Sequence, residues 1–471
     1  MAMTSWPTFS RDESPNSAIG MSDASIRKTA RSVCGSSPIS ARGQGEFLFD
    51  THGRKYIDAV SSLWCNVHGH HVPELDQAVR DQLDQVAHST LLGLCNIPSI
   101  ELAARLIDIA PAGLRKVFFS DDGSTAVEVA CKMAYQFWAN QGQPEKSRFL
   151  AFGEAYHGDT LGAVSVGGIP AFHQVYAPLC FPVDRVTPPQ LAPFAGLNAA
   201  TESLAASGAA MPWERAMESL ILANTGRYAG IIIEPVVQGA GGMIMHPSGT
   251  LKRLRHMADR HNLLLICDEV MTGFGRTGRM FASDHEQVCP DLLCLSKGLT
   301  AGYMPLGATL TTARVFDAFY DEPNVGKTFY HGHTYTGHPL ACAVGIASLD
   351  LFASRRLLEH SRAMGQLLWE EISVLRNHDH VGDVRQVGLT AAVEIIKSRH
   401  TGERYPWQWR VGGALCNRMR GAGILMRPLG DVLVIMPPLA IRPESVKSIA
   451  RAVIECIGNG LDGIVSEQET K

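Results

Sequence analysis

The stretch Asp291-Leu-Leu-Cys-Leu-Ser-Lys297-Gly-Leu-Thr-Ala-Gly302 decides how this chain folds, because it reads as a buried strand that ends on a lysine. Burial disfavours the charged ammonium, lowers its pKa and makes the amine a good nucleophile. A second apolar run upstream, Leu263-Leu-Leu-Ile-Cys-Asp268-Glu269, ends on an acid. A lysine for Schiff-base chemistry and an acid for a pyridinium nitrogen are the protein groups that pyridoxal phosphate (PLP) requires. The pair predicts a PLP site.

Short apolar runs alternate with helical patterns between Lys116 and Thr311, which predicts an α/β fold with a mostly parallel sheet covered by helices. Polar residues follow these runs, and ligands bind outside the carboxyl ends of the strands in such sheets. We therefore expect one site at this edge. The expected strands are Lys116–Phe119, Arg148–Phe152, Gly230–Ile233, Leu263–Cys267, Leu292–Leu295 and Leu306–Leu310.

A second, smaller α+β domain is predicted from strand patterns at 47–59, 381–395 and 423–436 and a helical pattern at 443–457. The predicted division has an N-terminal extension over residues 1–36 and the first part of the smaller domain over 37–75. The large cofactor-binding domain then covers 76–345, and the rest of the smaller domain covers 346–471.

The composition excludes several classes of protein. The 471 residues carry a net charge of −4 without a basic tract, so a nucleic-acid partner is not expected. No apolar run approaches the length of a membrane span, about 18 residues. The eleven cysteines are scattered, which is typical of a reducing cytoplasm. Histidines cluster at 68–71 and 331–338 without a completing Cys or carboxylate, so no metal site is predicted.

The segment Ser120-Asp-Asp-Gly-Ser-Thr-Ala-Val-Glu128 reads as a strand end followed by a helix start. Gly123 allows backbone to approach a ligand closely, and Ser124 adds a hydroxyl where the helix dipole favours an anion. Thr125 and Glu128 fit a capping box. The segment predicts a phosphate site, and the alternative is an ordinary capped helix.

Three further segments carry polar groups that suit a ligand, and two of them also have an ordinary structural interpretation. In Glu154-Ala-Tyr156-His157-Gly158 the tyrosine either stacks on a flat cofactor or packs in a turn. In His331-Gly-His-Thr334 the threonine is able to cap a phosphate. Arg427, between two strand patterns, either binds a substrate carboxylate or is a solvated hairpin arginine. The loop Gly273-Phe-Gly-Arg-Thr-Gly278 resembles no Walker motif.

With these segments assembled, the chain from about Ser37 to Ile457 resembles the class III aminotransferases of fold type I. Within that class it is most similar to the adenosylmethionine-8-amino-7-oxononanoate aminotransferases, the 7,8-diaminopelargonate synthases of biotin synthesis. The segments that carry the resemblance are Ser61-Ser-Leu-Trp-Cys-Asn-Val-His-Gly69, Asp122-Gly-Ser-Thr-Ala-Val-Glu128, Tyr156-His-Gly-Asp159, Glu234-Pro-Val-Val-Gln-Gly239, Asp268-Glu-Val-Met-Thr-Gly-Phe-Gly-Arg-Thr-Gly278, Leu295-Ser-Lys297, His331-Gly-His-Thr-Tyr-Thr-Gly337 and Arg427-Pro-Leu-Gly-Asp-Val432.

The resemblance implies a PLP-dependent transamination of 8-amino-7-oxononanoate to 7,8-diaminononanoate. It implies three catalytic residues, Lys297, Asp268 and Tyr156. The implied cofactor-binding residues are Gly123, Ser124, Tyr156, His157, Glu234, Asp268, Lys297, His333 and Thr334. The implied substrate-binding residues are Trp64, Tyr156, Lys297, Gly332 and Arg427, of which Arg427 binds the acceptor carboxylate.

The resemblance also implies a homodimer, in which Gly332, His333 and Thr334 reach the active site of the other subunit. The amino donor stays open between S-adenosylmethionine and lysine, because the chain has Leu63-Trp64 where users of S-adenosylmethionine typically have two tryptophans. Two other functions stay open. One is another class III ω-aminotransferase that uses a diamine or β-alanine, and the other is a non-catalytic ligand-binding or NAD-dependent protein.

Overall fold

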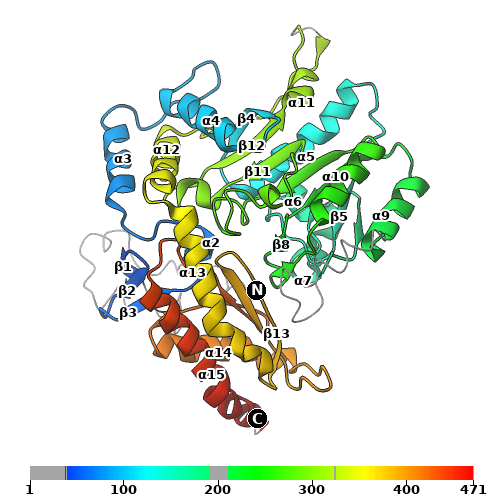
Figure 1. Ribbon diagram of the computed structural model, residues 1–471. Coiled ribbons are helices and arrows are strands. Elements are labelled where there is room, and N and C mark those ends of the chain that lie inside the picture. The colour runs from blue at the N-terminus through cyan, green and yellow to red at the C-terminus, as the bar shows by residue number, and fades with distance from the viewer. Residues whose placement is uncertain (1–37, 39, 191–209, 323–324, 470–471) are drawn as a thin grey trace, which may run out of the picture.

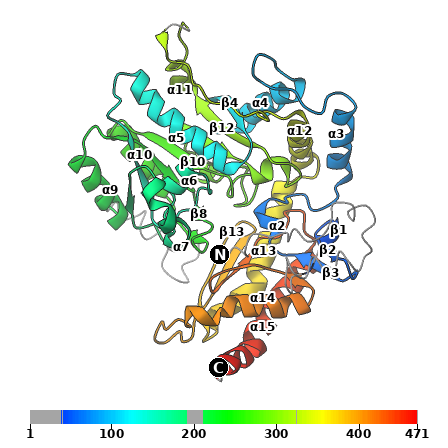
Figure 2. The ribbon, with the colours of Figure 1, turned by 180° about the vertical axis from the view of Figure 1, so that it is seen from behind.

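A computed structural model describes residues 38, 40–190, 210–322 and 325–469, and the predicted N-terminal extension lies outside these residues. Figure 1 shows a large twisted sheet with its helices in the upper part of the molecule and smaller sheets with the C-terminal helices below. Figure 2 shows the same two layers from behind. In the described part of the chain, no helix is both long and apolar enough to cross a bilayer.

The large sheet has seven strands in the order β4-β12-β11-β10-β7-β5-β6. Only β12 runs antiparallel to its neighbours, so the predicted α/β class with a mixed, mostly parallel sheet is confirmed. The strands are β4 (Leu114–Ser120), β5 (Arg148–Phe152), β6 (Val183–Val186), β7 (Tyr228–Ile233), β10 (Leu264–Asp268), β11 (Leu292–Leu295) and β12 (Gly307–Thr312).

All six predicted strands are present, with ends displaced by a few residues, and β6 was missed. The segment Val183-Asp-Arg-Val186 lies at the edge of the sheet and is only partly buried. A short polar edge strand has no continuous apolar run, because one of its sides has no neighbouring strand. Only the pairing with β5 identifies it.

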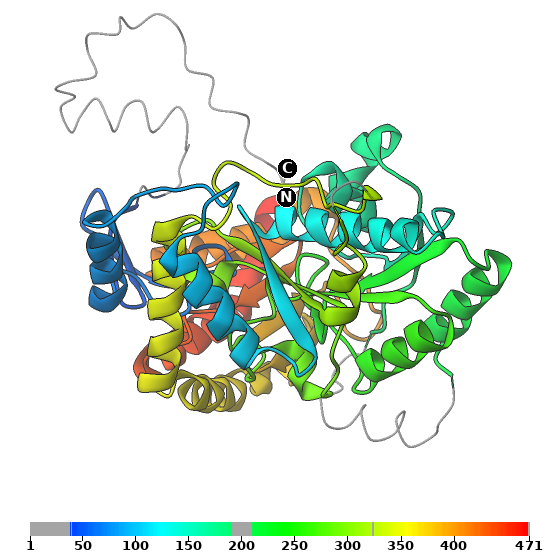
Figure 3. The same ribbon diagram turned by 90° about the horizontal axis from the view of Figure 1, so that it is seen from above.

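Both faces of the sheet are buried, as its apolar strands require. Alternate residues of strand β10 belong to two separate hydrophobic clusters. Leu265 and Cys267 pack in the cluster that contains helix α10 (Thr250–Arg260), whereas Leu264 and Ile266 pack in the cluster that contains helix α5 (Gly123–Asn140). Figure 3, from above, shows helices on both sides of the central strands. The sheet therefore forms a rigid central layer whose strand ends are fixed in position.

Two four-stranded sheets form the smaller part of the fold. The order β1-β2-β3-β15 joins residues near both ends of the sequence, and β13-β14-β17-β16 is built from the C-terminal third. Their strands are β1 (Ser40–Gln44), β2 (Phe47–Asp50), β3 (Lys55–Asp58), β13 (Val381–Val387), β14 (Thr390–Ile395), β15 (Ile424–Leu425), β16 (Pro428–Leu429) and β17 (Val432–Ile435).

The remaining elements are mostly helices. The α-helices are α2 (Ser61–Trp64), α3 (Pro73–Leu83), α4 (Ile97–Ile109), α6 (Leu161–Val166), α7 (Pro170–His173), α9 (Pro212–Ala223), α11 (Ala313–Asp317), α12 (Pro339–Ser354), α13 (Leu357–Ile372), α14 (Val411–Gly421) and α15 (Pro443–Glu469). The 3-10 helices are η2 (Gln174–Leu179), η3 (Ala282–His285), η4 (Lys297–Thr300), η6 (Ser373–Asn377) and η7 (Trp407–Trp409), and a hairpin is formed by β8 (Val237–Gln238) and β9 (Ile244–Met245).

Candidate active site

Residues that follow five strands of the large sheet line a single cavity of ≈ 500 Å³. The cavity lies at the carboxyl ends of the parallel strands, as ligand sites in such sheets do. Its lining contains Lys297 after β11, Asp268 at the end of β10 and Glu234 after β7. The full lining is Trp64, Asp122, Gly123, Ser124, Tyr156, His157, Gly158, Asp159, Thr160, Glu234, Ala240, Asp268, Val270, Met271, Ser296 and Lys297.

Lys297 begins the short helix η4 directly after β11, with its backbone in the left-handed region at φ 44°. This conformation is costly for a residue with a side chain, and it persists where the surrounding structure fixes it. Burial lowers the pKa of the amine, while the carboxylates of Asp268 and Glu234 oppose the shift. The amine lies 5.0 Å from the ring centroid of Trp64. The cavity therefore contains an amine that loses its proton more readily than an exposed lysine.

Asp268 is held from two directions. Its Oδ2 lies 2.7 Å from Nδ1 of His157, and its Oδ1 accepts a hydrogen bond of 3.0 Å from the amide of Val270. The imidazole of His157 has no exposed area, and its Nε2 is without a hydrogen-bond partner among the described residues. With Nδ1 donating to the carboxylate, the acid has a fixed orientation in the cavity wall.

Glu234 fixes two loops of the cavity. Its Oε1 accepts a hydrogen bond of 3.0 Å from the amide of Tyr156, and its Oε2 accepts one of 2.8 Å from the amide of Gly239. Burial raises the pKa of this carboxyl to about 7. The hydroxyl of Tyr156 donates to Oδ2 of Asp159 at 2.8 Å, so the phenol ring is also held at both ends. Glu234 thus positions Tyr156 through the backbone.

The N-terminus of α5 forms a cradle for an anion. The amides of Gly123 and Ser124 belong to the first turn of this helix, which has no intrahelical acceptors for them. Gly158 closes the cradle at φ 120°, and a Cβ there would lie 2.3 Å from the Ser124 hydroxyl. That hydroxyl also lies 2.8 Å from the hydroxyl of Thr160. Backbone amides, a hydroxyl and the positive end of a helix dipole suit a phosphate.

The helix start differs from the prediction in one detail. Asp122, rather than Thr125, is the N-cap: its carboxylate accepts from the amide of Thr125, and the Thr125 hydroxyl accepts from the amide of Asp122. The capping box therefore begins three residues before the predicted one. The prediction with Glu128 was wrong because the carboxylate of Glu128 accepts a hydrogen bond from the amide of Gly162.

These groups fit PLP. The cavity has an anion cradle at one side, a fixed carboxylate and a nucleophilic amine. The buried Nε2 of His157 has no partner among the described residues and is therefore available for a hydrogen bond. A dinucleotide would instead require the tight glycine order after a strand that this chain lacks.

Four predicted site residues do not line the cavity within one chain. Gly332 and Thr334 are exposed, and His333 lies with its Nδ1 2.8 Å from Oδ2 of Asp121, beside the cradle. Arg427 is exposed between β15 and β16. The lining also contains residues that were assigned no role from the sequence, such as Thr160, Met271 and Ser296. Met271 and Ser296 lie within quoted motifs and Thr160 directly follows one, so their position beside predicted site residues was the available signal.

Comparison with known proteins agrees with this geometry. The family model described as aminotransferase class-III matches residues 32–457. The chain is 52% identical over 408 residues to an adenosylmethionine-8-amino-7-oxononanoate aminotransferase of Geobacter sulfurreducens, covering 87% of this chain and 89% of the relative. It is 32% identical over 413 residues to a probable γ-aminobutyrate transaminase of Oryza sativa subsp. indica, covering 87% and 79%.

Solved structures of aminotransferases have a similar fold. The crystal structure of the adenosylmethionine-8-amino-7-oxononanoate aminotransferase of Methanocaldococcus jannaschii has a TM-score of 0.84 and 39% identity, covering 91% of this chain and 94% of the other. An amine transaminase from an uncultivated Pseudomonas species, in a PLP-bound form, also has a TM-score of 0.84, with 34% identity and coverage of 95% and 98%.

The cradle makes a specific prediction for Gly158→Ala. We expect at least a tenfold loss of PLP affinity, about 1.4 kcal/mol, because the new methyl group would displace the Ser124 hydroxyl. Gly142→Ala is the matched control, since Gly142 also has a positive φ, of 76°, but has nothing within 4 Å of the added Cβ. PLP titration of both apoproteins measures the difference. Equal affinities in the two variants would show that the cradle does not hold the phosphate.

Proposed function

Because this chain belongs to the class III aminotransferases, which depend on PLP, we propose that it transfers an amino group to 8-amino-7-oxononanoate to form 7,8-diaminononanoate in biotin synthesis. The observation that carries the proposal is the identity of 41–52% with seven relatives that are adenosylmethionine-8-amino-7-oxononanoate aminotransferases, over 87–92% of this chain. Family membership sets aside a non-catalytic or NAD-dependent protein. Identity to a γ-aminobutyrate transaminase is lower, at 32%, so another ω-aminotransferase is the second candidate.

Lys297 and Asp268 are the proposed chemical centre. PLP, when bound, supplies a protonated ring that withdraws electrons from the amine carbon of a substrate. Lys297 presents a nucleophilic amine with a lowered pKa, suited to hold the cofactor covalently and then to move a proton at the amine carbon. Asp268, oriented by His157, keeps the proton on the ring nitrogen through charge pairing.

The remaining cavity residues bind and orient. Gly123 and Ser124 hold the phosphate at the start of α5. Tyr156 covers the cofactor and substrate, and Glu234 acts through the backbone amide of Tyr156. Trp64, 8% exposed and close to the Lys297 amine, provides an apolar wall for the substrate. Together these contacts exclude water from the reacting carbon.

Arg427 is the proposed site for the acceptor carboxylate. Its guanidinium is exposed, and it lies two residues before Leu429. Leu429 and Tyr156 both pack against the hydrophobic cluster that contains Trp64. A guanidinium on this side of the cavity suits bidentate binding of a carboxylate at the far end of a long substrate.

We also propose a homodimer in which Gly332, His333 and Thr334 reach the partner's phosphate site. Large apolar side chains are exposed beside this loop: a Cβ on Gly332 would lie 3.6 Å from Leu92. Such a patch marks an interaction surface. Light scattering that gives the mass of one chain for the PLP-bound enzyme would rule this out. The exposed side chains are Leu92 at 69%, Leu94 at 61%, Ile97 at 76%, Ile100 at 60% and Tyr335 at 58%.

The predicted domain division and a cytoplasmic location are also proposals. The pairing of β3 with β15 supports the grouping of residues 37–75 with 346–471. Hydrogen exchange in which the two proposed domains open as one unit would contradict the division. Free thiols at ten described cysteines, from Cys65 to Cys456, support a reducing compartment, which cell fractionation tests.

The amino donor is S-adenosylmethionine or lysine. A sulfonium and an adenine favour aromatic faces, and this chain offers buried Trp64 next to Leu63, which is 43% exposed. Mixing the PLP-bound enzyme with each amine, without acceptor, and following the cofactor spectrum identifies the donor. Product analysis with 8-amino-7-oxononanoate then tests the reaction itself. Turnover of β-alanine or a diamine, without diaminononanoate formation, would replace the proposal with the second candidate.

Asp268→Asn should retain the fold and lose at least about 100-fold in turnover, because a fixed charge at the reacting system is removed. Asp259→Asn is the matched control, since this acid is on α10 and 63% exposed. Steady-state rates and PLP content are measured for both variants. Near-normal turnover in Asp268→Asn would show that the acid is wrongly assigned.

Arg427→Ala should weaken acceptor binding by about 2–5 kcal/mol and leave the donor half-reaction largely intact, because Arg427 is assigned to the acceptor carboxylate and not to the α-carboxylate of the donor. Arg451→Ala, at an exposed position on α15, is the control. Single-turnover measurements of each half-reaction separate the two effects. An equal loss in both halves would contradict the assignment.

A further inference from the structure

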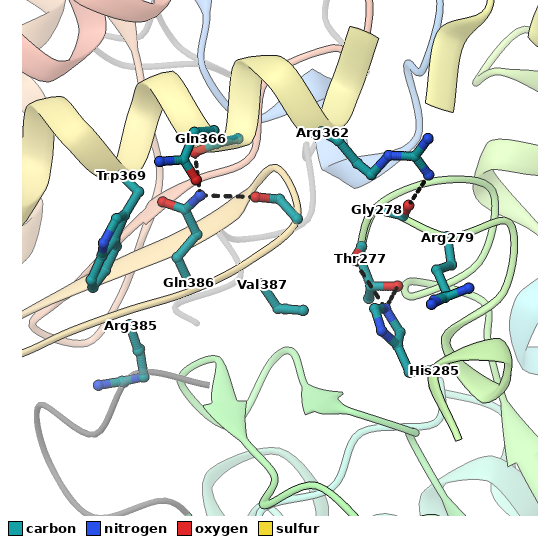
Figure 4. Close-up of a pocket in the computed structure, with 12 residues that line it drawn as sticks. Thr277, Gly278, Arg279, His285, Arg362, Gln366, Trp369, Arg385, Gln386 and Val387 are labelled. Carbon is teal, nitrogen blue, oxygen red and sulfur yellow. Dashed lines mark hydrogen bonds between the residues drawn. The ribbon is translucent and has the colours of Figure 1, made fainter. Parts of the chain in front are cut away.

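A second cavity, of ≈ 650 Å³, shares no lining residue with the candidate active site and lies mainly where three segments meet, with His285 from η3 added (Figure 4). The first is the loop 277–279, which follows the strand-end acid Asp268 along the chain. The second is the turn between β13 and β14, and the third is helix α13. The lining residues are Thr277, Gly278, Arg279, His285, Arg362, Gly365, Gln366, Trp369, Arg385, Gln386, Val387 and Gly388.

The walls of this cavity are fixed by backbone contacts that only glycine permits. A Cβ on Gly388 would lie 2.4 Å from the carbonyl carbon of Thr277, and one on Gly365 would lie 2.4 Å from the carbonyl oxygen of Gly388. Gln386 adds two hydrogen bonds, donating to the carbonyls of Gly365 at 2.6 Å and Gly388 at 2.9 Å. The cavity is therefore part of the packed junction between the loop and the smaller sheet.

The charge of the lining is positive. It contains three arginines and no carboxylate. Arg385 is compensated, because its Nη1 lies 2.9 Å from Asp383 and 2.8 Å from Glu394. Arg279 and Arg362 are exposed, and neither forms an ion pair within 4.0 Å in the described part of the chain. Burial raises the pKa of Asp284, and the charge of the Arg279 guanidinium opposes that shift. Arg362 donates only one hydrogen bond to protein there, to the carbonyl of Gly278 at 3.2 Å.

Arg279 and Arg362 lie on the same side of the cavity, and Trp369 and Gln386 lie across from them (Figure 4). Guanidinium groups bind carboxylates and phosphates bidentately, and a concave site with charges of one sign concentrates counter-ions. The half-buried Trp369 gives the opposite wall an apolar surface. A small organic or inorganic molecule with at least two acid groups matches this arrangement.

We propose that this cavity is a binding site for a small multivalent anion, held by Arg279 and Arg362. The bound molecule contacts the loop from the large sheet and helix α13 at once, so it stabilises their junction. The acid groups are either phosphates or carboxylates, which present the same charge and acceptor geometry to a guanidinium. The site is independent of the proposed transamination.

The test uses the PLP-bound enzyme, with pyrophosphate and citrate as the phosphate and carboxylate probes. Calorimetry should give saturable binding of one probe, and the thermal midpoint should rise above that in sodium chloride of equal ionic strength. Arg279→Gln and Arg362→Gln, made separately and together, should each weaken binding about tenfold or more. Both side chains are exposed, so these variants should fold as the parent does.

Two control variants distinguish binding in this cavity from binding elsewhere on the protein. Arg80→Gln removes one charge at an exposed position of α3 outside the cavity and should leave the affinity unchanged. Repeating the titration in Arg427→Ala removes the proposed carboxylate site of the active centre. Probe binding that survives unchanged in Arg279→Gln and Arg362→Gln, or that disappears in Arg427→Ala alone, would overturn the proposal. So would the absence of any heat or midpoint shift with both probes.

Discussion

The buried guanidinium of Arg276 joins the parts of this structure that are far apart in sequence. Its Nη1 donates to the carbonyl of Pro437 at 2.6 Å, and its Nη2 lies 3.4 Å from the carbonyl of Asn66. Its own carbonyl accepts from the amide of Leu389 at 3.2 Å. The side chain is 1% exposed, and burial lowers its pKa to about 10. One residue of the loop after Asp268 thus fixes the N-terminal segment and two segments of the smaller sheets.

This arrangement lets the cavity be built from segments that do not share an element. Asn66 lies two residues after Trp64, so the contact with Arg276 holds the chain next to the indole, whose ring centroid lies 5.0 Å from the Lys297 amine. A buried charge is costly unless hydrogen bonds or opposite charges compensate it. Two backbone carbonyls and the charge of Asp58 compensate part of that cost, while Nε has no partner among the described residues, and the positions of these groups depend on the complete fold. The same loop continues into the wall of the second cavity at Thr277.

Three residues in or beside the segments that line the cavity have a strained backbone. Trp64, Glu154 and Lys297 all have positive φ, at 64°, 57° and 44°. Such conformations cost on the order of 1–3 kcal/mol each and are maintained by the surrounding packing. At Lys297 the chain changes from strand β11 to helix η4 within two residues, and the side chain of Lys297 lines the cavity at this change of direction. At Glu154 it turns the chain toward Tyr156, whose amide Glu234 then holds.

The sequence by itself determined six of the seven strands of the large sheet, the order of the strand-end residues and the nature of the cofactor. Apolar runs that end on Asp268 and Lys297 contain that information, because the hydrophobic pattern and the chain direction are local properties of the sequence. Only the tertiary structure decided that His157 holds Asp268, that Glu234 acts through two backbone amides and that β6 completes the sheet. These contacts join residues far apart along the chain, and no local pattern specifies the distance between them. For the same reason, the sequence does not identify the hydrogen-bond partners of Arg276.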